Sequence, residues 1–467
     1  MQTLEPDATT AAATQTVAGH KLDRSTLPLL LTLGLGVFAG ALDLGVLSPA
    51  LPAFARAFGV GARETSWIFT LYLLANVASI PIMTKLADRN GRRPIYILCV
   101  AIFGAGSLLA IFAPNFGVFL TARAIQAIGA GGIFPVATAA IADRVPADRR
   151  GAALGLVAAT WGLAAVIGPT VGGLATHFLS WHWIFAANVP LAIVVIVLAR
   201  KNVPASAGNV RGPLDVAGIL SLSLGLLALM VALTHITRPI AAVEGACALV
   251  CLTIFVFVER TAKEPVIRPW LFTDRQLAVT YGLELLIGAL EGSLFFVPAA
   301  LVAAQHLSYA AAGGIAALGA FMFVAVIPLA GRALDAFGSR VVLTVGSLLT
   351  AAGLAIFAFG LNATWISIVA MVVAGTGFGA LLGAPTRYII TSRVSSADRA
   401  AAVGLLSIFL IIGQILGGSL AGGIVGAHAL DVIGYRDAYI AFTIIAIATA
   451  IGTFALQSRA KERLAAK

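Results

Sequence analysis

A short charged turn lies between two long apolar runs of this chain, at Thr84–Pro94, with the sequence TKLADRNGRRP. The turn gathers one acidic and four basic side chains, which are Asp88, Lys85, Arg89, Arg92 and Arg93. An apolar segment cannot carry these charges into lipid, because charged side chains are costly to bury in hydrocarbon. We therefore expect the turn to lie in water at one membrane face, with a spanning helix on each side.

The pattern of this turn returns later in the chain as GRALDAFGSR, residues Gly331–Arg340. A single offset of 247 residues relates the equivalent positions, which are Asp88 and Asp335, Gly91 and Gly338, and Arg93 and Arg340. A charged turn that recurs between apolar helices in both halves indicates an internally duplicated transporter. We expect the two turns, with Arg92 in the first, to act as gating loops at the cytoplasmic face.

Composition favours a membrane protein over a set of soluble domains. Of the 467 residues, 60% are hydrophobic and only 11% are charged, and the mean hydropathy is +0.99. Soluble proteins carry about 25% charged residues. The 49 glycines suit helices that approach one another closely in lipid. The three cysteines fall in apolar runs without histidine partners, so we expect no metal site.

The net charge of +10 records membrane topology rather than an anionic partner. Of the 30 lysines and arginines, the apolar runs place 24 at one face and four at the other, with Arg123 and Arg387 inside helices. An excess of basic residues marks the cytoplasmic side. We therefore expect a multi-pass protein of the cell membrane with both termini in the cytoplasm, and no nucleic-acid partner.

Apolar runs of about 20 residues, the length that spans a bilayer, follow one another along the chain. We predict an all-α membrane protein with about fourteen spanning helices, near 27–50, 66–84, 94–113, 116–141, 151–175, 183–200, 214–236, 239–259, 276–303, 311–330, 341–360, 364–390, 399–425 and 437–457. An even number of spans places both termini on the same side, as the charge bias also requires.

The duplication accounts for this number as six helices, plus two, plus six. A six-helix half occupies roughly 190 residues at this helix length, so the observed offset leaves room for an inserted pair. We expect a disordered cytoplasmic tail at 1–26, a six-helix bundle at 27–200, an inserted helix pair at 201–262, a second six-helix bundle at 263–457 and a cytoplasmic tail at 458–467. The inserted pair should pack outside the two bundles and contribute little to the central cavity.

Three carboxylates fall inside apolar runs, namely Asp43 in the first run and Glu284 and Glu291 in the ninth. Each would cost several kcal/mol against hydrocarbon, so each should face the bundle interior or a water-filled cavity. Glu284 and Glu291 are seven residues apart, which places them on one helix face about 10 Å apart along the axis. Burial favours the neutral form of a carboxyl group, so these side chains are candidates for binding and releasing protons. The alternative is an acid that is hydrogen-bonded for packing alone.

Two arginines also fall inside predicted helices. Arg123 lies in LTARAIQAIGAGG near Gln126, and a buried guanidinium keeps its charge and needs a carboxylate or polar partners. Arg387 lies toward the cytoplasmic end of the twelfth predicted helix. It is either the second-half counterpart of Arg123 or a side chain that reaches out to the membrane interface.

The fifth predicted helix carries a run of small residues and one proline, WGLAAVIGPTVGGL. Glycines allow close approach of backbones in a membrane, and a proline removes one helical hydrogen bond and permits a kink. We expect this run to form a close-packed seam between the two halves. Its members are Gly162, Gly168, Pro169, Gly172 and Gly173.

These motifs resemble those of the major facilitator superfamily, whose signature loop reads roughly G-x-L-A-D-R-x-G-R-R. Thr84 replaces the first glycine here, while the second copy keeps it at Gly331. The helix of Arg123 resembles the second signature of the family, which is associated with proton transfer. The glycine and proline run resembles the antiporter signature G-x-x-x-G-P-x-x-G-G, with Ala164 in place of its first glycine.

The first-helix string LDLGVLSPALP resembles the LDxTVVNVALP pattern of fourteen-helix drug:proton antiporters. Asp43 and Pro52 match the family positions, whereas Ser48 and Pro49 depart from the usual Asn-Val. The resemblance covers nearly the whole chain and implies two six-helix bundles that work by alternating access. It also implies export of small apolar or cationic substrates in exchange for protons. The coupling residues would be Asp43, Glu284, Glu291, Arg123 and Arg387.

Two alternative hypotheses for the function remain. One is a lipid or glycolipid exporter on the same fold, which a lateral apolar opening would favour. The other is a membrane-embedded enzyme or receptor, which would need a nucleophile–base pair, a metal cluster or a sizeable domain outside the membrane. The sequence shows none of these, so we expect a monomeric transporter in the lipid bilayer, with no enzymatic activity. We expect no cofactor, with the proton gradient as the source of energy.

Overall fold

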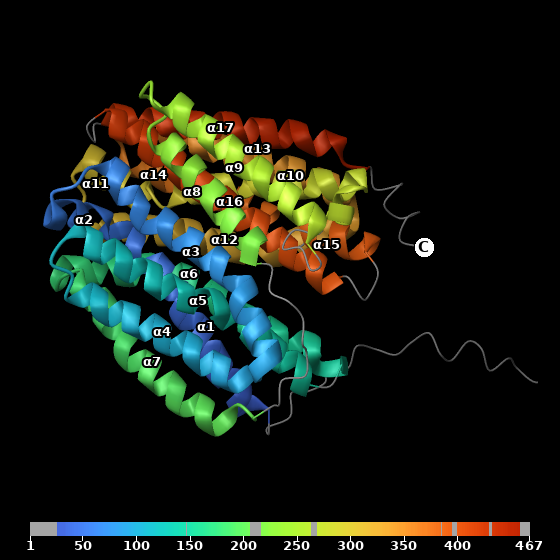
Figure 1. Ribbon diagram of the computed structural model, residues 1–467. Coiled ribbons are helices and arrows are strands. Elements are labelled where there is room, and N and C mark those ends of the chain that lie inside the picture. Colours follow the sequence, from blue (N-terminus) through green and yellow to red (C-terminus); the bar gives the residue numbers. More distant parts are fainter. Residues whose placement is uncertain are drawn as a thin grey trace, which may run out of the picture.

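The structure is a computed structural model that describes residues 26–145, 147–205, 216–262, 269–383, 385–394, 399–428 and 432–457. Every regular element within these residues is a helix (Figure 1). Thirteen helical spans in them are long and apolar enough to cross a membrane, and Gly162–Phe178 adds a shorter apolar stretch. The expected all-α membrane fold is confirmed.

The first half begins with a long helical span that a short 3-10 turn interrupts. The helix α1, Leu27–Leu47, continues through the short 3-10 turn η1, Ser48–Ala50, into α2, Leu51–Phe58, so this span runs beyond the predicted 27–50. Prolines within this stretch lack the N–H that a regular helix would use. The other helices of this half are α3 (Ala62–Asn90), α4 (Arg92–Ile111), α5 (Phe116–Arg144), α6 (Ala147–Phe178) and α7 (His182–Asn202).

The second half repeats this order with two breaks. Its helices are α10 (Arg275–Leu294), α11 (Val297–Gln305), α12 (Tyr309–Phe337), α13 (Ser339–Phe359), α14 (Thr364–Leu381), α15 (Pro385–Arg393), α16 (Arg399–Ala427) and α17 (Val432–Gly452), with 3-10 turns η2 (Pro269–Phe272) and η3 (Thr453–Ala455). The run predicted as one helix at 364–390 is therefore divided. Gly383 favours an interruption there, and Pro385 cannot donate a helical hydrogen bond.

The duplication is visible in the backbone. Helices α3 and α12 are both 29 residues long, and their first residues, Ala62 and Tyr309, are 247 positions apart. Both end at a glycine with positive φ, 97° at Gly91 and 83° at Gly338. This backbone conformation strongly favours glycine. The two equivalent glycines therefore make the same sharp change of direction into the next helix.

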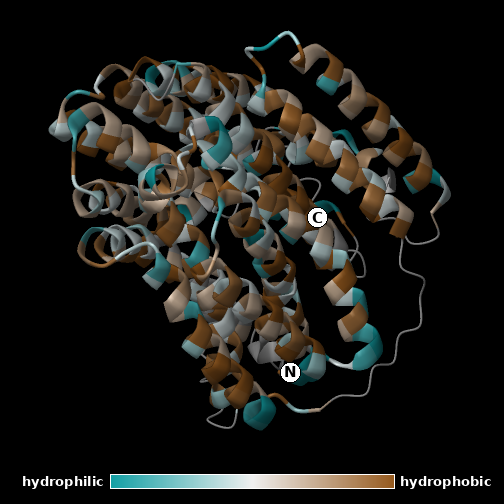
Figure 2. Ribbon diagram, turned by 60° about the vertical axis from the view of Figure 1, so that its left-hand side comes forward, coloured by the Kyte–Doolittle hydropathy of each residue, from teal (hydrophilic) through white to brown (hydrophobic). Residues whose placement is uncertain are grey.

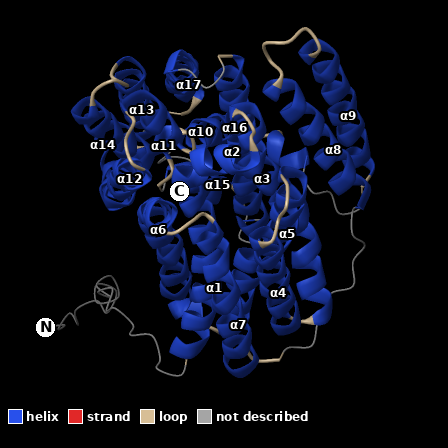
Figure 3. Cartoon of the chain, turned by 90° about the vertical axis from the view of Figure 1, so that its left-hand side faces the viewer, coloured by secondary structure: helices blue, strands red, loops and turns tan. Residues whose placement is uncertain are grey.

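The remaining helices α8 (Val216–Thr234) and α9 (Ala241–Thr261) form a hairpin at the side of the molecule (Figure 3). They pack mainly against each other, and α8 also contacts α3 of the first half and α16 of the second. Leu249 and Phe257 are among the exposed hydrophobic residues of α9. The hydropathy colouring of the ribbon shows this hairpin as largely hydrophobic (Figure 2). Such a surface is suited to contact with lipid rather than water.

The two charged turns lie at one end of the bundle, which we call the turn end. At the opposite end, called the far end, α2 leads into α3 and α11 into α12. Here the Ser48 hydroxyl donates a hydrogen bond of 2.7 Å to the Phe295 carbonyl, and the rings of Phe69 and Phe295 stack at 4.1 Å. These contacts join the first half to the second. The far end is therefore closed in this conformation.

Candidate functional site

The most deeply buried charges belong to an ion pair inside the first half. The Arg123 Nη1 on α5 lies 2.6 Å from the Asp43 Oδ2 on α1, and both side chains are fully shielded from solvent. Burial of single charges in such a place would be very unfavourable, so each requires the other. The sequence predicts a carboxylate or polar partner for Arg123, and in the structure this partner is Asp43.

Two amides complete the surroundings of Asp43. Gln126 on α5 and Asn188 on α7 each donate a hydrogen bond of 2.8 Å to Asp43 Oδ1, and Gln126 also donates to the Ser107 hydroxyl. The Gln126 carbonyl oxygen accepts from Arg123. The Asp43 carboxylate therefore accepts hydrogen bonds from three side chains, those of Arg123, Gln126 and Asn188.

Aromatic rings cover the guanidinium of this pair. The Cζ of Arg123 lies 4.2 Å from the centre of the Tyr72 ring and 5.8 Å from that of Phe185. In the described chain, the Nε and Nη2 of Arg123 have no hydrogen-bond partner. Ring faces attract a cation, which offsets part of this loss. The cluster as a whole is buried and hydrogen-bonded, and its residues come from five helices, α1, α3, α4, α5 and α7.

The second half carries its carboxylate at the equivalent position but in different surroundings. Glu291 is the seventeenth residue of α10, as Asp43 is of α1. Its Oε2 accepts a hydrogen bond of 2.8 Å from Gln414 on α16, and the side chain is partly exposed. The structure shows no ion pair for Glu291 within the described residues. One amide replaces the arginine and two amides around Asp43.

Glu284 lies two turns nearer the turn end of α10 and is 4% exposed. The hydroxyl of Thr386 on α15 bonds to it, whereas its Oε2 is buried without a hydrogen-bond partner in the described chain. Arg387 is exposed on α15 and lies within electrostatic range of Glu284. It therefore does not repeat the buried environment of Arg123.

The first charged turn is held by a small ion network. Arg92 pairs with Asp88 one helical turn before it and donates from Nε to Asp143 Oδ2 at the end of α5, at 3.0 Å. Arg93 is the neighbouring, partly exposed residue of the same turn. This network links the start of α4 to the ends of α3 and α5, and it gives the turn a fixed shape around Gly91.

The second charged turn keeps the backbone of the first but not all of its contacts. The Arg340 guanidinium lies 4.7 Å from the centre of the Phe454 ring in η3. The side chain of Asp335 lies outside the described part of the structure. A separate ion pair of 2.9 Å joins Arg393 of α15 to Asp274, the residue that caps the start of α10. Hydrogen bonds from the backbone of Gln276 and from Arg393 outweigh the effect of burial and lower the pKa of Asp274.

The glycine and proline run of α6 contacts two neighbouring helices, α1 of the first half and α12 of the second. Gly168 and Gly172 lie against Gly45 and Val46 of α1, where any added Cβ would overlap with backbone atoms. These two glycines therefore make a seam inside the first half. The expectation of a seam between the halves does not describe them, because α1 and α6 belong to the same bundle.

Other members of the same run do meet the second half. A Cβ on Gly173 would lie 2.5 Å from the Tyr309 carbonyl oxygen of α12, and Gly313 of α12 packs on the Pro169 carbonyl of α6. Gly162 lies further along, where a Cβ would meet Val324 at an ordinary 3.6 Å. The side of α6 that carries Gly173 is thus the tight contact between halves at the far end.

The sequence did not single out Asn188, Gln414 or Tyr72 as site residues. Asn188 and Gln414 carried a usable signal, because each is a lone amide within a long apolar run. An amide in such a run needs a hydrogen-bonding partner inside the protein. Tyr72 gave no comparable signal, since tyrosine is common both in cores and at interfaces.

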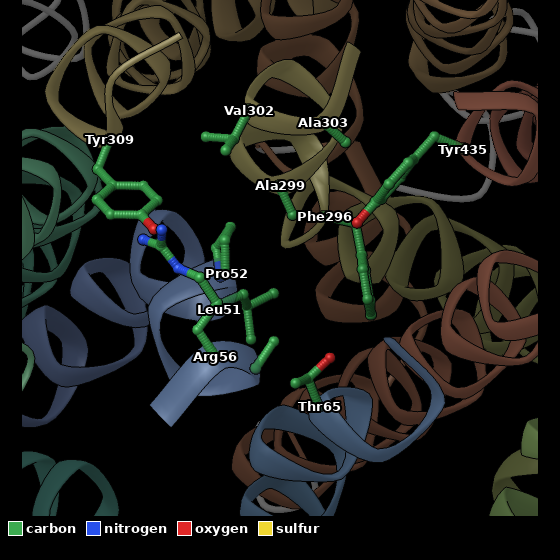
Figure 4. Close-up of a pocket in the computed structure, with 11 residues that line it drawn as sticks. Leu51, Pro52, Arg56, Thr65, Phe296, Ala299, Val302, Ala303, Tyr309 and Tyr435 are labelled. Carbon is green, nitrogen blue, oxygen red and sulfur yellow. The ribbon is translucent and has the colours of Figure 1, made fainter. Parts of the chain in front are cut away.

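A cavity lies between the halves at the far end (Figure 4). Its volume is about 260 Å³, and most of its wall is aliphatic or aromatic. Residues of α2, α3, α11, α12 and α17 line it, so it depends on both halves. It is separate from the ion pair of Asp43 and Arg123, which is absent from its wall.

Comparison with known proteins places this geometry in context. The chain is 32% identical over 424 residues to an uncharacterized MFS-type transporter, YfiU, of Bacillus subtilis (strain 168), covering 86% of this chain and 80% of that protein. It is 29% identical over 420 residues to the multidrug transporter protein MdtP of the same organism, covering 87% and 76%. A third relative there, multidrug resistance protein 3, is 30% identical over 298 residues, which are 62% of this chain and 58% of that protein.

Solved structures of similar fold have low sequence identity. A POT family transporter in complex with a thioalcohol-conjugated peptide matches with a TM-score of 0.69 at 15% identity, covering 90% of this chain and 94% of that one. The xylose transporter XylE from E. coli, in a partially occluded inward open conformation, matches with a TM-score of 0.65 at 13% identity, covering 92% and 97%. These likenesses support the arrangement of the helices.

The profile of the Major Facilitator Superfamily matches residues 33–304 and 277–466, two overlapping segments that together cover most of the chain. The two matches follow the internal repeat, with one segment for each half and the inserted hairpin within the first. On the duplicated turns, the helical fold and this match, the chain belongs to the major facilitator superfamily.

Proposed function

We propose that this protein exports small apolar or cationic molecules across the membrane in exchange for protons. Relatives named as a multidrug transporter and a multidrug resistance protein support export of small molecules. The difference between the surroundings of Asp43 and Glu291 is the observation that carries the proton part of the proposal. This difference supports distinct roles for two acids at equivalent positions.

Asp43 is surrounded by hydrogen-bond donors. It accepts hydrogen bonds from Arg123, Gln126 and Asn188. A protonated carboxyl group would have to donate a hydrogen bond, and these three groups approach it as donors. Protonation would also leave the buried guanidinium without its counter-charge. The pair therefore provides two fixed opposite charges inside the first half.

Glu291 is suited to exchange protons. Within the described part of the chain, only the Gln414 amide is bonded to it. This amide can rotate to accept from a protonated carboxyl group as easily as it donates to a carboxylate. Among the described residues no buried cation pairs with it, and its side chain is partly exposed. Glu291 thus changes charge at low structural cost, which is what a proton carrier in a transport cycle requires.

Alternating access would couple these groups to movement. The halves meet at the far end through Gly173 and Tyr309, and the ion network around Arg92 stabilises the first turn at the other end. A change of charge at Glu291 shifts the balance between the two access states if one state solvates the acid better. Glu284, beside Thr386 and Arg387, lies between Glu291 and the turn end and would extend the proton path.

Transport into liposomes tests the proposal. The purified protein would be reconstituted, and uptake of the cationic dye ethidium would be followed after a pH jump that makes the lumen acidic. We expect a proton gradient to drive accumulation and a collapsed gradient to stop it. Glu291→Gln should lose gradient-driven uptake, whereas Glu64→Gln, an exposed carboxylate at the start of α3, should not.

Two results would contradict the proposal. Accumulation that ignores the gradient would remove proton coupling. Transport of a fluorescent phospholipid, with no transport of ethidium or of a neutral apolar dye, would instead favour the lipid exporter.

A further inference from the structure

The far-end cavity has two walls that belong to different halves. Pro52 and Arg56 of α2 line one side, and Val302 of α11 and Tyr309 of α12 line the other (Figure 4). Tyr435 of α17 extends the wall of the second half. Its volume of about 260 Å³ accommodates a small two-ring molecule or a short acyl chain.

The cavity contains a cation that has no carboxylate partner in the described part of the chain. Arg56 points across it toward Tyr309, with Cζ 5.3 Å from the centre of that ring (Figure 4). Its side chain is exposed and makes no ion pair with any described residue. A guanidinium binds a carboxylate through two parallel hydrogen bonds, and an apolar wall strengthens that attraction. The site therefore combines an anion-binding group with an apolar surface.

The cavity also depends on the conformation. Its walls meet only while the far end is closed, as the bond between Ser48 and Phe295 and the stacked rings of Phe69 and Phe295 show it to be. Opening of the far end, which the proposed export cycle requires, would pull Arg56 away from Tyr309. A ligand that binds one state more tightly than the other shifts the balance toward that state.

We infer that this cavity binds a small amphiphilic carboxylate, with its acid on Arg56 and its apolar part against the second half, and that the bound acid holds the far end closed. The site is an inhibitory one, distinct from Asp43 and Glu291. The inference rests on the alternating access of the proposed function. The same chemistry describes an aromatic acid from water and a fatty acid from the bilayer.

The test uses a single reporter cysteine at the far end. Thr70→Cys on α3, which lies against Gly418 of α16, would be introduced after replacement of the three native cysteines. A membrane-impermeant maleimide reacts with it only when the two halves separate. The protein in liposomes would be labelled with and without 1-naphthoate, and with 1-naphthamide, which has the same rings and no charge.

We expect 1-naphthoate to slow labelling about tenfold at saturation, equal to about 1.4 kcal/mol of preference for the closed state, and 1-naphthamide to have little effect. Arg56→Gln should abolish the slowing and Arg56→Lys should keep part of it. Arg238→Gln, an exposed arginine at the same end, should behave as the parent. Thermal unfolding gives a second readout, since 1-naphthoate should raise the Tm of the parent and leave Arg56→Gln unchanged.

Dodecanoate supplied within the liposomes tests whether the natural ligand comes from the bilayer or from water. Protection by dodecanoate alone indicates an acid from the bilayer. Protection by 1-naphthoate alone indicates an acid from water. Equal slowing by the acid and the amide, or slowing that survives Arg56→Gln, would overturn the inference while leaving export untouched. A reporter that never reacts under transport conditions would overturn alternating access at this end, and the inference with it.

Discussion

Asp43 and Glu291 stand at the same place in the two halves and differ in almost everything around them. Asp43 is enclosed by Arg123 and two amides, while Glu291 has one amide and some exposure. An offset of 247 or 248 residues puts Ala370 or Met371 opposite Arg123. The second half therefore has no cation at the position from which Arg123 acts.

This difference shows how a duplicated fold can divide a task. Duplication places a carboxylate at equal depth in both bundles, and the neighbouring helices then decide whether it keeps a charge or changes it. The buried ion pair fixes the helices of the first half relative to one another. In the proposed cycle the acid with the sparser surroundings would exchange the proton, and the predictions that follow separate these two roles.

The largest effect is expected on removing the buried cation. Arg123→Ala leaves Asp43 ionised and desolvated, and breaking a buried pair in this way costs about 3–5 kcal/mol. We expect a marked fall in thermal stability in detergent. Arg387→Ala, which removes an exposed arginine, should change stability little.

A double variant checks the cause. Asp43→Asn with Arg123→Gln removes both charges, so it should lose clearly less stability than the sum of the two single variants. Additive losses would mean that the pair does not interact as the structure shows. The matching change in the second half, Glu291→Gln, should leave stability close to that of the parent, because no described cation pairs with Glu291.

Two adjacent glycines of α6 should give smaller and different effects. Gly172→Ala adds a methyl against Val46 within the first half and should lower stability by about 1–3 kcal/mol. Gly173→Ala presses on Tyr309 of the other half and should open the far end. Labelling of the Thr70→Cys reporter distinguishes them, since it should accelerate for Gly173→Ala only. Equal acceleration by both would refute the division of this run into two seams.

The smallest effect is expected for the ion pair between Asp274 and Arg393. The pKa of Asp274 is lowered in the folded protein, so its contribution to stability is present above the ordinary carboxyl pKa and is lost as pH falls through the folded value. Asp274→Asn should destabilise at neutral pH by less than about 1 kcal/mol, because the carboxylate is 37% exposed. Unfolding curves of parent and variant should converge in acid, and a gap that widens there would contradict this assignment.

Much of the fold follows from the sequence because lipid imposes simple rules. Long apolar runs had to be helices, and the repeated turn fixed the relation between the halves. Gly91 and Gly338 were recognised as equivalent from spacing, and both adopt positive φ. Gly383 and Pro385 carry a signal for the break after α14, but hydropathy does not reveal it, because Leu382 and its neighbours are as apolar as any helix interior.

The site was less accessible to sequence reasoning. Asp43 and Arg123 were each expected to be buried and partnered, yet their pairing joins helices that are 80 residues apart in sequence. A single sequence carries no information on such contacts beyond the need for charge balance. The separate packing of Gly172 and Gly173 likewise depends on which way α6 is rotated, and the uniformly apolar run around them gives no preferred face.

The central claim is that Glu291 exchanges the proton while Asp43 keeps its pairing with Arg123. Its most direct test is the pH dependence of far-end opening, measured as the labelling rate of the Thr70→Cys reporter between acid and alkaline pH. We predict that the rate changes with pH in the parent and in Asp43→Asn, and becomes independent of pH in Glu291→Gln. A flat profile in Asp43→Asn together with an unchanged one in Glu291→Gln would contradict the account.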